Sequence, residues 1–257
     1  MVHLKKANSG TGEYPLMRAP FAVIFDMDGV LLDTENIAKQ CWKAAAEKTG
    51  WTGWEETYLS VVGNSMDVQQ AAMNQALGEE GGTRFREVIR EHFRSGFNSG
   101  PLPVKTGARE VLSYLHGQGI PLAVASSTIE EIVRRNLTDT DLLRYFDKVI
   151  GGNQIRHGKP APDIFLTAAE VLDRPPEECF VIEDSFHGIR AAHFAGCRPV
   201  MVPDVLEPTA EIAALAEEIF PTLLETEEYF RFLCENSAAG NGRAPVITDT
   251  RRIPSWH

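Results

Sequence analysis

Short, mostly apolar runs recur along the chain, and each run stops at a polar or glycine-containing segment. Continuous apolar runs are typical of strands that are buried on both faces of a parallel sheet. These runs predict strands at residues 21–25, 120–125, 148–150, 179–182 and 199–202.

Between these runs, apolar residues recur with the spacing of an amphipathic helix. Helices are predicted at residues 108–116, 128–137, 162–172 and 188–195. The second of these opens with Thr128 and Glu131, which have the spacing of a capping box. Strands that alternate with helices imply right-handed crossovers, so the pattern predicts an α/β fold with a doubly wound parallel sheet, a Rossmann-like core.

One segment departs from this alternation. From Glu35 to about Pro101 the pattern predicts helices only, at residues 36–49, 65–77 and 83–97. We therefore expect a small all-helical cap domain inserted after the first strand. The predicted domains are a flexible N-terminal extension (1–19), the core (20–34 and 103–224), the cap (35–102), and a C-terminal helix with a loosely ordered tail (225–257).

Composition narrows the function classes. The chain has 257 residues and a formal net charge of −11. It therefore lacks the excess of basic residues that is typical of nucleic-acid-binding proteins. No apolar run approaches the ~20 residues that span a bilayer, and no apolar stretch follows Lys5 and Lys6 as in a signal peptide. The four cysteines are scattered, so we expect reduced thiols in a cytoplasmic protein. We further expect a monomer or weak dimer that binds neither nucleic acid nor membranes.

Polar residues follow several predicted strands at the points where those strands end. In a parallel sheet these ends meet at one edge, where ligands bind. The residues in question are Asp26 and Asp28, Ser126 and Ser127, Lys159, and Glu183 and Asp184.

These residue types suggest a cation site beside an anion site. Clustered carboxylates resist ionisation unless a cation compensates them, and their oxygens suit Mg²⁺. Lys159 with such an ion would attract a phosphate, to which Ser126 could donate a hydrogen bond. Gly29 permits a turn that brings Asp26 and Asp28 to one site. One aspartate could then attack phosphorus while the other moves protons.

The same residues carry a resemblance to a known superfamily. Asp26-Met27-Asp28-Gly29-Val30-Leu31-Leu32-Asp33-Thr34-Glu35 resembles the first signature of the haloacid dehalogenase-like superfamily. The segments that resemble the second, third and fourth signatures are, in this order, Val124-Ala125-Ser126-Ser127, Gly158-Lys159-Pro160-Ala161-Pro162-Asp163 and Val181-Ile182-Glu183-Asp184-Ser185. The resemblance spans roughly residues 21–221 and is strongest to phosphatases and mutases related to β-phosphoglucomutase and phosphoglycolate phosphatase.

This resemblance implies a role for each matching residue. It implies that Asp26 is the nucleophile and a metal ligand, and that Asp28 is the general acid/base whose carbonyl also touches Mg²⁺. It further implies that Asp184 binds the metal, with Glu183 supporting it directly or through water. Ser126 and Lys159 would hold the phosphate. Further substrate contacts are expected from Ser127, Thr34 and Asn64, and Met66 and Arg94 are additional cap-side candidates.

The resemblance also favours one activity over its alternatives. Dehalogenases of the superfamily lack the aspartate that stands here as Asp28, so phosphoryl chemistry is favoured. The cap histidine and arginine of β-phosphoglucomutases correspond to Ala38 and Met66. We therefore expect a Mg²⁺-dependent phosphatase that hydrolyses a small phosphorylated metabolite, a sugar phosphate or phosphoglycolate, through an aspartyl-phosphate. A phosphosugar mutase and a non-catalytic binding protein that kept the pocket are the alternatives.

Overall fold

The computed structural model describes residues 21–63, 66–97 and 100–238. The predicted extension at 1–19, the predicted tail beyond 238 and the candidate residue Asn64 lie outside the described residues. Within the described part, no helix is long and apolar enough to cross a membrane.

The centre of the fold is a six-stranded parallel sheet in the order β3-β2-β1-β4-β5-β6. Its strands are β1 (Ala22–Phe25), β2 (Leu122–Ser126), β3 (Lys148–Gly151), β4 (Cys179–Glu183), β5 (Arg198–Met201) and β6 (Glu218–Ile219). The predicted doubly wound parallel sheet is confirmed. The strand β6 was not predicted, because two residues give no hydrophobic pattern.

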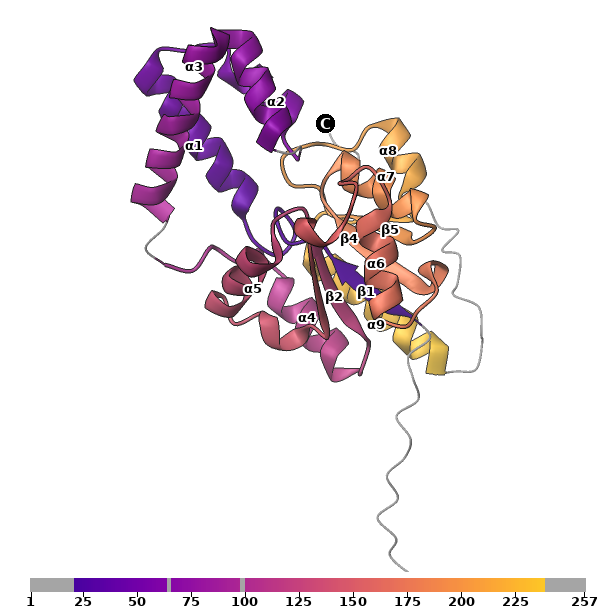
Figure 1. Cartoon of the computed structure of the whole chain (residues 1–257). Helices are drawn as coiled ribbons and strands as arrows, with labels where there is room; N and C mark the ends of the chain where they lie inside the picture. Colours follow the sequence, from indigo (N-terminus) through magenta and orange to yellow (C-terminus); the bar gives the residue numbers. More distant parts are fainter. Residues whose placement is uncertain (1–20, 64–65, 98–99, 239–257) are drawn as a thin grey trace, which may run out of the picture.

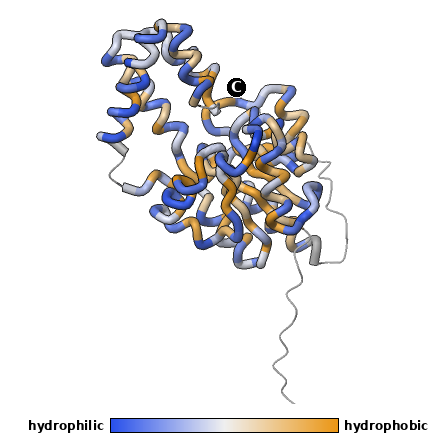
Figure 2. Tube along the Cα trace, in the orientation of Figure 1, coloured by the Kyte–Doolittle hydropathy of each residue, from blue (hydrophilic) through white to orange (hydrophobic). Residues whose placement is uncertain are grey.

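Helices cover both faces of the sheet (Figure 1), and successive residues of β1 belong alternately to the apolar clusters on the two faces. Val23 and Phe25 pack with α4 (Ala108–Gly117), α5 (Glu130–Asp139) and α9 (Leu223–Ala238). Ala22 and Ile24 pack with α6 (Asp163–Val171) and α7 (Phe186–Phe194). Because β1 is buried on both faces, its sequence is apolar throughout (Figure 2).

Shorter elements complete the core. They are α8 (Ala210–Leu215) and the 3₁₀ helices η1 (Leu143–Tyr145), η2 (Gly152–Gln154) and η3 (Pro176–Glu178). One prediction about a helix end is wrong. The helix α5 begins at Glu130 without a side-chain cap, because the Thr128 hydroxyl bonds elsewhere (below).

The helical cap lies above the carboxyl edge of the sheet in Figure 1 and consists of α1 (Thr34–Thr49), α2 (Trp54–Val61) and α3 (Met66–Phe97). It has its own apolar cluster, in which the rings of Trp42 and Phe85 lie 5.4 Å apart. The helix α2 was not predicted. The two later predicted helices merge into α3 across Gly78, whose φ of 74° breaks the helical backbone. The exact domain boundaries stay a prediction.

The two linkers between cap and core pair with each other. The Asp33 N–H donates to the Pro103 carbonyl (2.9 Å), and the Lys105 N–H donates to the Leu31 carbonyl (3.0 Å). An antiparallel bridge joins Leu32 and Val104 between them. These bonds fix the two ends of the cap beside each other, close to the turn that follows β1.

Candidate active site

A tight turn after β1 brings both aspartates of the first motif to the sheet edge. The Asp26 N–H donates to the Ile182 carbonyl of β4 (3.0 Å), so the strand pairing continues to Asp26. The N–H groups of Leu31 and Leu32 then both donate to the Met27 carbonyl (3.0 Å each). Gly29 occupies the turn with a φ of 80°, a conformation that favours glycine.

The end of β4 supplies two further carboxylates next to this turn. Glu183 is the last residue of β4 and is 1% exposed, and Asp184 follows it. A Cβ atom on Gly29 would lie 2.3 Å from Asp184 Oδ2. The Asp184 carboxylate therefore packs directly against the turn that carries Asp28. This position is where the strand order reverses between β1 and β4, the place where open α/β sheets bind ligands.

Lys159 joins the two strand ends. Its ammonium donates to Asp26 Oδ1 and to Glu183 Oε1, the latter at 2.6 Å, and its side chain is 7% exposed. It also lies 5.1 Å from the centre of the Phe165 ring. Buried charges are stable only when paired, and here one ammonium serves two carboxylates.

Glu183 is held by donors on both carboxylate oxygens. Its Oε2 accepts from the N–H groups of Asp184 (3.0 Å) and Ser185 (2.9 Å) and from Ser185 Oγ (3.0 Å). Ser185 is in turn the N-cap of α7, because its Oγ accepts from the Gly188 N–H (3.0 Å). Donors therefore contact both oxygens of Glu183, and its support of a metal, directly or through water, stays a prediction.

Replacing Gly188 by Ala should disturb this network. A Cβ atom there would lie 1.8 Å from Glu183 Oε1 and 2.3 Å from Oε2, so the carboxylate must move away from Lys159. We expect Gly188→Ala to lower phosphate release at least about tenfold and to destabilise the fold by ~1–3 kcal/mol. Enzyme assays and urea unfolding measure both effects. Gly158→Ala is the matched control, because its Cβ would meet no atom within 4 Å. Equal behaviour of the two variants would contradict the expectation.

Asp28 is oriented by two hydroxyl groups near the end of β2. Ser126 Oγ (3.2 Å) and Thr128 Oγ1 (3.0 Å) both donate to Asp28 Oδ2. The Thr128 N–H also donates to Ser126 Oγ (3.1 Å). Thr128 was missed as a site residue, although a hydroxyl two residues beyond a strand end was a usable signal. Ser127 is exposed, and no contact of its side chain with this group is found among the described residues.

The residues predicted to contact the substrate from the cap side lie in different surroundings. Thr34 Oγ1 accepts from the Gly29 N–H (3.2 Å) and so belongs to the turn. Ala38 packs against the apolar cluster of the cap, and Met66 is 51% exposed.

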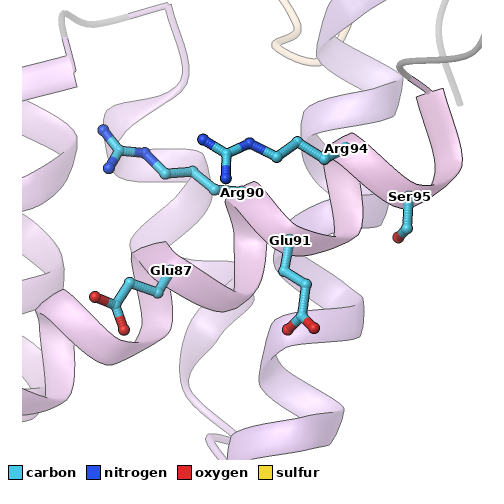
Figure 3. Close-up of a pocket in the computed structure, with 5 residues that line it drawn as sticks. All are labelled: Glu87, Arg90, Glu91, Arg94 and Ser95. Carbon is cyan, nitrogen blue, oxygen red and sulfur yellow. The ribbon is translucent and has the colours of Figure 1, made fainter.

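Arg94 lines a separate open hollow of about 560 Å³ together with Glu87, Arg90, Glu91 and Ser95. All of these residues come from α3, and Figure 3 shows Arg90 and Arg94 extending to the same side of that helix while Glu91 points away from them. The hollow therefore belongs to one helix surface and shares no lining residue with the carboxylates at the sheet edge.

The site carries excess negative charge. Burial raises the pKa of Asp26, with Lys159 opposing this and Glu183 and Asp28 adding to it. Burial likewise raises the pKa of Asp184 well above its ordinary value, and the charges of Glu183 and Asp26 raise it further. The pKa of Lys159 is raised, because attraction to Asp26 and Glu183 outweighs the opposing effect of burial. One ammonium does not balance these carboxylates, so a further cation would stabilise their ionised forms.

The available donors fit Mg²⁺. No group of three His, Cys, Asp or Glu side chains among the described residues is arranged to hold a metal. The carboxylates of Asp26 and Asp184, with the Asp28 carbonyl that the resemblance implies, would nevertheless give an all-oxygen set that phosphate and water could complete. No hydrogen bond or ion pair to the Asp184 carboxylate is found within the described ranges, so this group remains available for a cation.

Comparisons with known proteins place the chain in a family. The family model of haloacid dehalogenase-like hydrolases matches residues 23–202. A phosphorylated carbohydrates phosphatase from Thermotoga maritima is 33% identical over 83% of this chain and 98% of its own length. A fructose-1-phosphate phosphatase from Escherichia coli is 30% identical over 70% of this chain and 95% of its own. Among solved structures, a provisionally assigned β-phosphoglucomutase from Thermotoga maritima is 30% identical, with a TM-score of 0.65, and the match covers 83% of this chain and 99% of that one.

Proposed function

We propose, from the premise that the chain belongs to the haloacid dehalogenase-like hydrolase family, that this phosphoric monoester hydrolase releases phosphate from a small phosphorylated metabolite with the help of Mg²⁺. The observation that carries the proposal is the meeting of Asp26, Asp28, Asp184 and Lys159 at the reversal point between β1 and β4. Its relatives include phosphatases of phosphorylated carbohydrates and of fructose 1-phosphate, which supports a sugar phosphate as substrate.

In the first step, a carboxylate oxygen of Asp26 attacks phosphorus and the bond from phosphorus to the ester oxygen breaks. Lys159 bonds to Oδ1 of Asp26, so Oδ2 is the oxygen left for attack. Asp28, held by Ser126 and Thr128, gives its proton to the departing oxygen. The products of this step are the free alcohol and an aspartyl-phosphate on Asp26.

In the second step, water attacks the phosphorus of the aspartyl-phosphate while Asp28 accepts a proton from that water. The bond between phosphorus and Asp26 breaks, so the carboxylate is regenerated and inorganic phosphate leaves. Lys159 would hold the phosphate oxygens, joined by Ser126 once its hydroxyl turns from Asp28 to the phosphate, with Ser127, Thr34 and Asn64 as further proposed contacts. When held by Asp26, Asp184 and the Asp28 carbonyl, Mg²⁺ would offset negative charge on both the carboxylates and the phosphate. We assign Glu183 to positioning Lys159.

A panel of sugar phosphates, phosphoglycolate and p-nitrophenyl phosphate, assayed for phosphate release with Mg²⁺, tests the proposal. A phosphosugar mutase would instead convert a hexose phosphate into its isomer with little free phosphate. The packing of Ala38 within the cap cluster supports the phosphatase, because an alanine provides no group for proton transfer. Phosphate release from none of the esters would overturn the proposal.

Chelation gives an independent prediction. We expect excess EDTA to reduce phosphate release at least about 100-fold, because Asp184 and Asp26 would again repel the phosphate. Adding Mg²⁺ beyond the chelator should restore it. Circular dichroism is the control, since the buried apolar core needs no metal and should keep its helix signal. Undiminished turnover after complete chelation would exclude the metal from the mechanism.

A further inference from the structure

A second group of polar side chains lies where the cap meets the core. We call it the linker cluster and define it as Asp33 and Lys105 of the two linkers, Glu35 of α1, Tyr58 of α2 and Asp204 after β5. None of these residues takes part in the steps described above. The next residues after Asp204, Val205 and Leu206, pack against the apolar cluster of the cap, so the cluster is enclosed by both parts of the protein.

The linker cluster holds more carboxylates than cations. Lys105 Nζ donates to Asp204 Oδ1 (2.7 Å) and lies 3.7 Å from Asp33 Oδ1. The Tyr58 hydroxyl lies within hydrogen-bond distance of the Glu35 carbonyl (3.0 Å) and of Glu35 Oε2 (3.2 Å). One ammonium therefore faces three carboxylates.

One oxygen of the cluster is buried without a partner. The Asp204 side chain is 6% exposed, and its Oδ2 has no hydrogen-bond partner among the described residues. A buried carboxylate oxygen left unpaired is costly, and most such oxygens in folded proteins accept a hydrogen bond. Within the described part of the chain, Asp204 Oδ2 is therefore a buried acceptor without a donor, which a hydroxyl of a bound ligand could supply.

The linker cluster adjoins the phosphoryl site. Thr34, the neighbour of both Asp33 and Glu35, accepts a hydrogen bond from Gly29 of the catalytic turn. Burial, and next the charge of Asp28, raise the pKa of Glu35 to about 7. Gly29 also packs against the Asp184 carboxylate, so the catalytic turn lies between the linker cluster and the phosphoryl site, and the alcohol part of an ester bound at Asp26 would extend toward the cluster.

We propose that the substrate of this site is a monophosphate ester of a neutral polyhydroxyl compound, whose hydroxyls donate to Asp204 and Glu35, and that esters with an anionic alcohol part are rejected. This inference rests on the proposed function and chooses between its two substrate types, in favour of sugar phosphates over phosphoglycolate. Hydroxyls supply the donors that the carboxylates lack. A carboxylate on the substrate would supply none and would meet like charge.

A matched pair of esters tests the inference. Glycerol 3-phosphate and 3-phosphoglycerate are of similar size, but the second carries a carboxylate where the first carries a hydroxymethyl group. Specificity is measured as kcat/KM with Mg²⁺, or as an inhibition constant against p-nitrophenyl phosphate for an ester that is not turned over. We expect at least a tenfold preference for glycerol 3-phosphate.

Two variants connect this preference to the linker cluster. Glu35→Gln and Asp204→Asn each remove one negative charge, so each should reduce the preference at least threefold. Both variants are measured because Asp204 also accepts a hydrogen bond from Lys105, so Asp204→Asn alone could disturb the fold. Glu170→Gln, an exposed charge on α6, is the control and should leave the preference unchanged. A purely structural role would change both esters alike and leave their ratio intact.

The outcomes separate the two claims. The inference would be overturned by equal use of the two esters, by a preference for 3-phosphoglycerate, or by a preference that neither variant alters. Each of these outcomes counts against it even if phosphate is released. Release of no phosphate from any ester, p-nitrophenyl phosphate included, would overturn the proposed function itself.

Discussion

Asp26→Asn should fold normally and release phosphate at least about 10⁴ times more slowly than the unaltered protein. Asp26 is 5% exposed and lies directly beyond β1, so asparagine keeps its size and its backbone bond to Ile182. An amide cannot replace the carboxylate as nucleophile, and it carries no charge for a cation. The effect should therefore appear in kcat and persist at saturating substrate.

Two measurements support that expected result. Thermal unfolding should show a folded Asp26→Asn protein, and acid quenching during turnover of a labelled ester should trap phosphate on the unaltered chain alone. Asp139→Asn, at an exposed position at the end of α5, is the control for removal of one carboxylate and should remain active. Substantial turnover by Asp26→Asn would show that another group attacks phosphorus.

Lys159→Met should damage both activity and stability. Methionine fills a similar volume but removes the only ammonium found near Asp26 and Glu183 within the described chain. Breaking a buried ion pair from one side typically costs ~3–5 kcal/mol, because the remaining charge is left uncompensated. We expect phosphate release to fall at least about 100-fold, since Lys159 both orients Asp26 and would contact the phosphate.

The loss of stability in Lys159→Met should increase with pH. Burial raises the pKa of Asp26 to about 8 in the folded protein, and removing Lys159 removes the opposing attraction, so this pKa should rise further in the variant. Between the two values, the folded variant keeps a proton on Asp26 that the folded unaltered protein has lost, whereas the unfolded carboxylate is ionised in both. From about pH 8 upward, the stability of the variant should therefore fall relative to that of the unaltered protein.

Urea unfolding of Lys159→Met at pH 6, 8 and 9.5 measures this trend. Its difference from the unaltered protein should be smallest at pH 6 and largest at pH 9.5. Lys148→Met, at the exposed start of β3, provides the control and should show little difference at any of the three values. A difference that stays constant with pH would mean that the carboxylates near Lys159 do not change their protonation in the variant.

The sequence by itself determined the parallel sheet and its main chemical groups. The runs that became β1 and β4 are apolar on both faces, and burial on both faces of a sheet is a local requirement that a single sequence records. The ends of those runs located Asp26, Asp28, Glu183 and Asp184, because parallel strands end at one edge.

Only the tertiary structure decided which groups bond to which. Thr128 fitted a helix cap in the sequence, but its hydroxyl bonds to Asp28, one hundred positions away along the chain. Lys105 and Asp204 are 99 positions apart, and neither belongs to a periodic pattern. Hydrophobic periodicity reports the burial of each segment and carries no information on its partners, so contacts such as these are set by how the strands and the loops at their ends come together in the folded core.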